Sequence, residues 1–381
     1  MTPVRVPISQ EVLQWAITRT GKTTTELATQ ADFKHVHDWM ERKKQPTLKQ
    51  ARSLAKKAGI PFGYLLLPVP VEVTPDLPDF RTEKNTRLGE TSKELEEQIF
   101  QSQRNLTWYA ENAAVYGGRC PELLNTANLN QSPETVAHRT REIVGWSPGT
   151  STNGKTFVNL LAEQIEDCGI VVMKSSTVGS NTHSRLDRDE FRGFTLIEDG
   201  YALIFVNTAD AATANLFSLA HELGHVLLGK QGVSSDEEHN RIEQWCNKFA
   251  AAFLLPKESL ADSKFVNPID IEYLGAKSRQ LGPSVEAIAW RMVTLNLLAP
   301  KAAGALIYQW KNLVQPRIGE KPKGGPRPDV MARARLGSNF IAALSEAYGR
   351  GALTYRDAAR LTGYRKVSTI ETVLDFRPVM G

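Results

Sequence analysis

The sequence predicts an α+β protein with an all-helical N-terminal domain, a central domain that contains a small sheet, and a helical C-terminal tail. Residues 8–68 read as five short helices, the second and third of which form a helix-turn-helix. Residues 191–197 and 201–206 alternate apolar and polar side chains around an Asp-Gly pair, which is a hairpin signal. The apolar run 169–173 adds a short buried strand.

Changes in composition and the Pro- and Gly-rich stretches divide the chain of 381 residues into five segments. They are a helical domain at 1–68, a connector with one helix at 69–132, the central domain at 133–300, a linker at 301–326 and a basic helical module at 327–381. The last segment is expected to be either a second small module that docks to nucleic acid or protein or an ordinary helical cap. A linker is expected there because residues 316–330 are rich in Pro, Gly and Lys.

The net charge of +4 is distributed unevenly. Residues 1–68 carry +6 and residues 301–381 carry +8, which leaves −10 for residues 69–300. Basic ends favour contact with an anionic polymer such as DNA, although charged faces that only keep the protein in solution are the alternative. The sequence shows no signal peptide, no long apolar run and no disulfide pattern, which predicts a cytoplasmic protein without membrane contact.

The helix-turn-helix has one face suited to DNA. Residues 33–40 predict its second helix, with Val36 and Trp39 directed inward. Asp38 and Glu41 oppose phosphate contact, so docking to another protein stays open as the alternative. The residues expected to face DNA, on this helix and the turn after it, are Lys34, His35, His37, Arg42, Lys43 and Lys44.

The segment 218–225 contains the pattern His221-Glu222-x-x-His225 after an apolar lead-in. Positions four apart on an α-helix differ by only about 40° in direction, so both imidazoles project from one face and can bind one metal ion. Glu222 is displaced by roughly 60° from His225, which is too far for a natural ligand. It is well placed to act as the general base for an attacking water.

A third ligand is predicted at Glu243, on the flank of the apolar stripe of a helix over 241–255. A carboxylate beside a buried face is costly unless it is paired or bound to a metal, and the alternative is a salt-bridged surface glutamate. The predicted centre is therefore His221, His225 and Glu243 with an open fourth position, zinc as the metal and Mn²⁺ as the alternative. The thiol of Cys246, three residues after Glu243, could approach the metal, but a small buried side chain is the preferred interpretation.

Residues 149–156 match the phosphate-binding pattern G-x-x-x-x-G-K-[ST] letter for letter. That loop requires a buried strand directly before it, and residues 141–148 are interrupted by Gly and Pro. A loop and an N-cap for a helix over 156–167 is the preferred interpretation.

The motifs HELGH at 221–225 and ExxCNxFAxxFLLP at 243–256 together resemble the ImmA/IrrE family of metallo-endopeptidases, with Cys246 where Ala is common. The similarity covers about residues 10–300 and extends to 190–194, 200–207 and 77–82. The last of these looks like the branch of the family that carries a fused XRE-type helix-turn-helix. The resemblance implies a zincin-like domain at 133–300 whose edge strand receives the substrate as an added strand.

The resemblance also implies a function. By this resemblance the protein is expected to be a zinc-dependent endopeptidase that cleaves one specific protein, typically an XRE-type repressor in a stress-response, mobile-element or defence circuit. A toxin or the product of a neighbouring gene is a further partner. The alternative is a DNA-binding transcriptional regulator or antitoxin whose peptidase fold serves sensing or docking without hydrolysis, with both basic ends on DNA. The retained Glu222 and the complete ligand set favour the enzyme.

Overall fold

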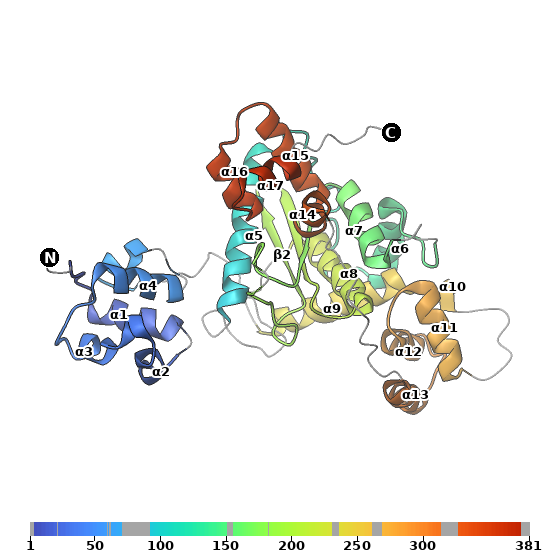
Figure 1. The fold of residues 1–381 in the computed structure, drawn as a ribbon. Coiled ribbons are helices and arrows are strands. Elements are labelled where there is room, and N and C mark those ends of the chain that lie inside the picture. Colours follow the sequence, from blue (N-terminus) through green and yellow to red (C-terminus); the bar gives the residue numbers. More distant parts are fainter. Residues whose placement is uncertain are drawn as a thin grey trace. The chain divides into compact units, whose positions relative to one another are not determined.

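The computed structural model describes residues 4–20, 22–58, 60, 62–70, 92–150, 155–181, 183–230, 236–260, 269–313 and 327–374. The chain divides into two compact units, Met1–Asp76 and Leu77–Gly381. Over the described ranges the fold is mixed α and β, mostly helical with one three-stranded sheet, as the sequence predicts (Figure 1). None of the described helices combines the length and apolar composition that a membrane crossing requires.

The described elements of the N-terminal unit are short helices, with one isolated bridge between Arg5 and Thr47, and they pack around an apolar core that includes Val36 and Trp39. Thr23 and Glu26 form a capping box at the start of the second helix: each side chain accepts from the other residue's backbone N–H. The helix predicted over 33–40 is shorter than expected: Phe33 ends a 3₁₀ turn, residues 34 and 35 form a turn, and the α-helix begins at Val36. The elements are α1 Gln10–Arg19, α2 Thr24–Ala28, η1 Ala31–Phe33, α3 Val36–Met40, α4 Leu48–Ala58 and η2 Phe62–Leu66.

The sheet of the second unit has the strand order β1-β3-β2, with β1 Val171–Ser175, β2 Gly193–Glu198 and β3 Tyr201–Asn207. Strand β1 runs parallel to β3, and β2 runs antiparallel to it. The predicted hairpin is confirmed: Glu198 pairs with Tyr201 across Asp199 and Gly200, whose φ angles are 47° and 82°. Positive φ at both turn residues matches the right-handed twist of the strands.

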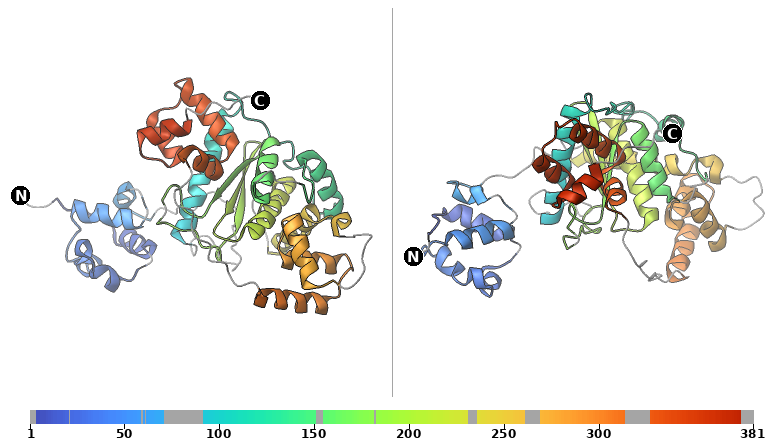
Figure 2. Two further views of the ribbon diagram at one scale, coloured as in Figure 1. Left: turned by 45° about the vertical axis from the view of Figure 1, so that its right-hand side comes forward. Right: turned by 45° about the horizontal axis from the view of Figure 1, so that its top comes forward.

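Helices cover both faces of the sheet (Figures 1 and 2). One face, with Ala202, Ile204 and Val206, packs on the α7 and α8 side in a core that also holds α6, α9, α11 and α12. The other face, with Phe194, Leu196 and Phe205, packs on α5 and the C-terminal helices. The helices of this unit are α5 Lys93–Asn112, α6 Pro133–Val144, α7 Phe157–Asp167, α8 Ala212–Leu228, α9 Asp236–Leu254, α10 Lys257–Leu260, α11 Ile271–Leu281, α12 Val285–Thr294, α13 Pro300–Leu313, α14 Pro328–Leu336, α15 Ser338–Gly349, α16 Tyr355–Thr362 and α17 Val367–Leu374.

The linker predicted at 301–326 is wrong in its first half, because α13 occupies Pro300–Leu313 and packs on α12. Residues 314–326 lie outside the described ranges, as do the similarity segment 77–82 and residues 151–154 of the phosphate-loop pattern. Thr156 is the N-cap of α7, as predicted, and Lys155 pairs with Glu163. The predicted C-terminal helices are present as α15, α16 and α17. With α14 they cover the second face of the sheet and belong to the same compact unit as the sheet.

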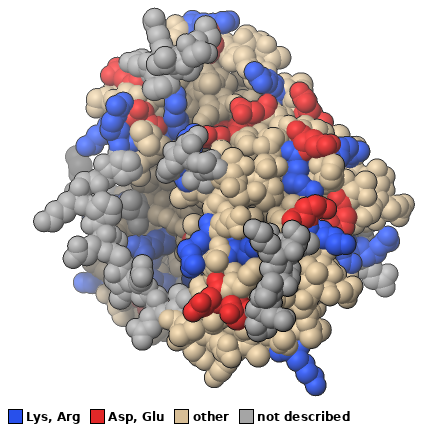
Figure 3. All heavy atoms as spheres, turned by 90° about the vertical axis from the view of Figure 1, so that its right-hand side faces the viewer, with Lys and Arg blue, Asp and Glu red and all other residues tan. Residues whose placement is uncertain are grey.

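Charge is mixed on the side of the molecule where α10–α13 lie in Figure 1. In the view of that side in Figure 3, positive and negative side chains are interspersed among uncharged ones. This face therefore does not present a field of one sign.

Candidate metal centre

Helix α8 carries both histidines of the His-Glu-x-x-His pattern. It lies between the sheet and α9, so most of its side chains are buried, and it ends at Gly229 in the left-handed conformation (φ 61°). Helix α9 crosses beside it and supplies Glu243. The apolar stripe predicted for this helix is buried, and its residues are Ile242, Trp245, Cys246, Phe249, Ala250 and Phe253.

The three predicted ligands come together. The Nε2 atoms of His221 and His225 lie 3.2 Å apart. Glu243 places Oε2 at 3.2 Å from His221 Nε2 and Oε1 at 3.2 Å from His225 Nε2. In a tetrahedral zinc site with bonds of 2.0–2.1 Å, ligand atoms are separated by about 3.3 Å. The donor set and its spacing therefore fit a divalent metal with one coordination position left open.

Two residues of α9 hold the imidazole rings. Asn247 Oδ1 lies 3.1 Å from His221 Nδ1, which leaves Nε2 to face Glu243. The thiol of Cys246 bonds the His225 ring, and it is fully buried against Gly224. Outer partners of this kind fix the orientation and tautomer of ligating histidines. Neither role was predicted from the sequence; Cys246 was correctly predicted to be a buried thiol.

The charges at this site oppose the effect of burial. Burial alone would raise the pKa of Glu243, but hydrogen bonds to His221 and His225 outweigh it and hold the pKa well below its usual range. Burial alone would lower the pKa of His225, but Cys246, Glu243 and Glu222 outweigh it and raise the pKa well above its usual value. The site thus has the electrostatic character of a cation-binding centre.

Glu222, on the same helix as both histidines, contacts strand β2. It exposes 7% of its surface, and Thr195 Oγ1 donates to its Oε2 at 2.8 Å and to its backbone oxygen at 3.1 Å. Burial raises the pKa of this carboxyl, against the influence of His225, His221 and Thr195. A Cβ on Gly193 would lie 3.0 Å from Glu222 Oε1, so glycine is the residue that leaves this carboxylate its space. Neither Thr195 nor Gly193 was singled out in the sequence.

Strand β2 presents backbone groups beside Glu222. Asn207 N donates to Arg192 O at 2.8 Å, so residue 192 and every second residue after it bond β3. Gly193 and Thr195 alternate with them and direct their N–H and C=O groups away from β3. Over the described ranges no other strand pairs with β2, which is the edge of the sheet.

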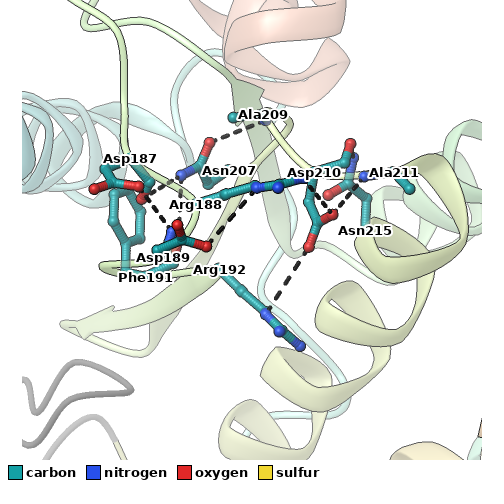
Figure 4. Close-up of polar contacts among 10 residues, drawn as sticks. All are labelled: Asp187, Arg188, Asp189, Phe191, Arg192, Asn207, Ala209, Asp210, Ala211 and Asn215. Carbon is teal, nitrogen blue, oxygen red and sulfur yellow. Dashed lines mark hydrogen bonds and ion pairs between the residues drawn. The ribbon is translucent and has the colours of Figure 1, made fainter. Parts of the chain in front are cut away.

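A polar cluster joins the start of β2 to the start of α8 (Figure 4). The buried Asn207 Nδ2 donates to Phe191 O at 3.1 Å and to Asp187 O at 3.2 Å, and its Oδ1 accepts from Ala209 N. Asp210 lies within 4.0 Å of both Arg188 and Arg192. These contacts fix the loop before β2 relative to the helix that carries the histidines.

The six predicted DNA contacts lie on the surface of the N-terminal unit. Three of them are engaged by acidic neighbours: His35 and Lys44 contact Asp38 at 3.0 and 3.1 Å, and Lys43 contacts Glu41. These ion pairs are exposed, and exposed pairs contribute little free energy. Lys43 and Lys44 also line a shallow hollow with Arg5. DNA binding by this unit remains a prediction.

Residues 165–292 match the family model of the IrrE N-terminal-like domain, Peptidase_M78. The match includes the three strands, α8 and α9, and thus the three predicted ligands and Glu222. It supports the ImmA/IrrE resemblance for this segment and a metallopeptidase-type domain there, and it extends neither to the N-terminal unit nor to α14–α17. No curated protein matches the chain.

Proposed function

We propose that this chain is a zinc-dependent endopeptidase with His221, His225 and Glu243 as metal ligands and Glu222 as the catalytic base. The observation that carries the proposal is that the Nε2 atoms of His221 and His225 lie 3.2 Å apart and each lies 3.2 Å from one carboxylate oxygen of Glu243, close to the buried Glu222. A site that served structure alone would more often be closed by a fourth protein ligand.

A divalent metal bound here would supply Lewis acidity toward the scissile carbonyl and the attacking water. Glu222 accepts the proton of that water and passes it to the departing amine. Thr195 holds one carboxylate oxygen of Glu222, and Gly193 leaves room for the other. Asn247 and Cys246 keep the imidazoles in the orientation in which both Nε2 atoms face Glu243.

The edge of β2 favours an extended protein substrate. A peptide that pairs with the outward backbone groups of Gly193 and Thr195 brings its carbonyl next to Glu222. Only an unfolded segment can pair in this way, so the cut falls in an exposed linker of the substrate. We propose an XRE-type repressor encoded near this chain as that substrate, because the N-terminal unit has the helical pattern of such a domain.

We also propose that the N-terminal unit binds DNA. The supporting observation is that Lys34, His37 and Arg42 are exposed together with the paired Lys43 and Lys44. A regulator or antitoxin without hydrolysis would use the same surface, with a toxin as its partner. The two functions differ in whether Glu222 is needed.

The test combines metal content with cleavage. Purified wild type should hold about one zinc per chain and cut the neighbouring repressor at one or a few sites. Glu222→Gln should keep the metal and lose cleavage, whereas His221→Ala and Glu243→Ala should lose both. In cells under DNA damage, equal regulation of the target genes by wild type and Glu222→Gln would show that hydrolysis is dispensable. The protein would then be a regulator that does not cleave its partner.

A further inference from the structure

The interface between α5 and the C-terminal helices buries a stripe of polar side chains. Gln98, Gln101, Ser102 and Asn105 each expose 8% or less and follow one another along one side of α5. Gln98 Oε1 and Asn105 Oδ1 are shielded from solvent and have no hydrogen-bond partner among the described residues. Buried polar groups in folded proteins are nearly always paired, so orphaned atoms on one stripe indicate a binding place.

Two half-buried arginines lie near this stripe, Arg104 on α5 itself and Arg335 on α14, and the exposed Arg360 on α16 acts on the charge of Arg104. In the described part of the chain none of them forms an ion pair; the exposed Glu97, on α5, is the acidic group that acts on Arg104. Arg104 Nε and Arg335 Nη1 are buried without a hydrogen-bond partner. A buried guanidinium is costly without a counter-charge, and a bound anion would supply one.

Two nitrogen donors converge on one point beside Gly363. The position of a Cβ on Gly363 lies 3.3 Å from both Arg335 Nη1 and Gln101 Nε2, and 3.7 Å from the backbone nitrogen of Ser180. Gly179 stands near the same two side chains, with its Cβ position 3.1 Å from Gln101 Oε1 and 3.8 Å from Arg335 Nη1. Both glycines have positive φ, so neither position readily accepts a side chain that would fill the space.

The rest of Arg335 is already fixed. Its Nη2 donates to the carbonyl of Thr362, and its guanidinium lies over the ring of Tyr364 at 4.9 Å. Ser180 Oγ donates to Gly363 O at 2.6 Å and ties the loop after β1 to the turn after α16. Nη1 is therefore held in place as the donor left for a ligand.

We propose that Gln101, Arg104, Ser180 and Arg335 form a binding site for a small oxyanion, the phosphate or carboxylate group of a small molecule. Arg335 Nη1 and Gln101 Nε2 donate to the oxyanion, and the amides of Gln98 and Asn105 can turn over to present their N–H₂ groups. The loop that carries Ser180 continues to strand β2 beside Glu222. In the alternative arrangement no ligand binds. The Gln101 amide is then rotated by 180°, so that its oxygen accepts a hydrogen bond from Arg335 Nη1.

The test measures thermal unfolding of the full chain with inorganic phosphate and, separately, with acetate, each against chloride at matched ionic strength. A ligand that binds only the folded state raises Tm in a saturable way, by several degrees at a hundredfold excess over Kd. Wild type should show this rise with one of the two ions, and which ion gives the larger rise distinguishes phosphate from carboxylate. Arg335→Gln and Gln101→Leu should lose it. Arg356→Gln, an exposed arginine on α16, should keep it.

A second readout separates binding from a structural role. In chloride alone, Arg335→Gln should have a Tm equal to or above that of wild type, because the uncompensated buried charge is gone. The order should reverse at saturating anion. A Tm lowered equally in both salts would show that Arg335 only supports Thr362 and Tyr364. A saturable rise retained by Arg335→Gln, or no saturable rise of wild type with either ion, would overturn the site.

Discussion

The side chain of Glu222 owes its position to two residues of strand β2. Thr195 donates to its Oε2, and the missing side chain of Gly193 leaves room for its Oε1. The carboxylate is thereby held against β2, although it belongs to the same helix as both histidines. A base at this position must be near the open coordination position without occupying it.

Replacing Thr195 by valine keeps the shape of the side chain and removes the hydrogen bond to Glu222. A hydrogen bond to a charged group contributes about 1.5–3 kcal/mol, so kcat should fall by roughly tenfold or more. Zinc content should stay at the wild-type level, because Thr195 touches no ligand. Thr195→Ser, which retains the hydroxyl, is the matched control. Equal activity of the valine and serine variants would show that the hydroxyl does not position the base.

Gly193→Ala should reduce turnover through space alone. The new Cβ would lie 3.0 Å from Glu222 Oε1 and 2.9 Å from the backbone oxygen of Phe205, so the carboxylate or the strand must move. A misplacement of about 1 Å at a catalytic group can cost on the order of a hundredfold in rate. Gly304→Ala, at a helical position with nothing within 4 Å, should keep full activity. Peptide-cleavage rates of the two variants, with zinc content measured in parallel, make the comparison.

The metal triad could be predicted because its information is local. Helical spacing places His221 and His225 on one face, and the burial pattern of the next helix singles out Glu243. The roles of Thr195, Asn247 and Cys246 depend on how β2 and α9 pack against α8, and no spacing in the sequence contains that information. The family match over 165–292 covers these residues as well, although it assigns none of them a role.

At the scale of elements, the hairpin was predicted and helix α13 was missed. The Asp-Gly turn between two alternating runs is a short-range signal, so β2 and β3 follow from residues 191–206 alone. The Pro- and Gly-rich run at 316–330 predicts a linker, and that prediction was extended back over residues 301–313, which form a helix. Pro300 at the first helical position and the spacing of Ala303 and Ile307, both buried, are the signals that favour a helix there.

Gly275→Ala tests whether α13 packs on α11. Alanine normally stabilises a helix interior by about 1 kcal/mol relative to glycine, and it would do so here if residues 300–313 were a free linker. In the structure the new Cβ would lie 2.9 Å from the ring of Trp310 on α13, so the substitution should destabilise the protein by about 1–3 kcal/mol. Urea unfolding gives the free energies. Adding Trp310→Leu should reverse the loss, and a stabilised Gly275→Ala single variant would contradict the packing of α13.

At the scale of the whole chain, the sheet is enclosed on both faces by segments far apart in sequence. Helix α8 and its neighbours cover one face, and α5 with α14–α17 covers the other (Figure 2). For residues 327–381 the sequence left open a separate docking module or an ordinary helical cap, because composition does not reveal which apolar faces meet; the structure shows helices that cover the sheet. Glu166, on α7, connects the helices of the two faces through Asn339 on α15. Its Oε1 accepts from Asn339 N at 3.2 Å, and its backbone oxygen accepts from Asn339 Nδ2 at 2.6 Å.

This junction should make stability depend on pH. Burial raises the pKa of Glu166 from 4.5 to about 7, against the backbone N–H groups that it accepts from. Because the pKa is higher in the folded state than in the unfolded state, the unfolded protein binds fewer protons between these two values. The free energy of unfolding contributed by this group is therefore full below pH 4.5 and is lost as pH rises through about 7, by on the order of 3 kcal/mol.

Glu166→Gln keeps an acceptor for the backbone of α15 and removes the titrating group. The variant should be more stable than wild type at pH 8 and nearly equal to it at pH 5, because only wild type must bury a carboxylate at the higher pH. Urea unfolding at the two pH values gives the difference, and Glu163→Gln, an exposed residue of the same helix, should leave the pH dependence unchanged. A wild-type protein whose stability does not fall between pH 5 and pH 8 relative to Glu166→Gln would mean that Glu166 is solvated. The helices α14 and α15 would then not cover it, and the second face of the sheet would be open along β1.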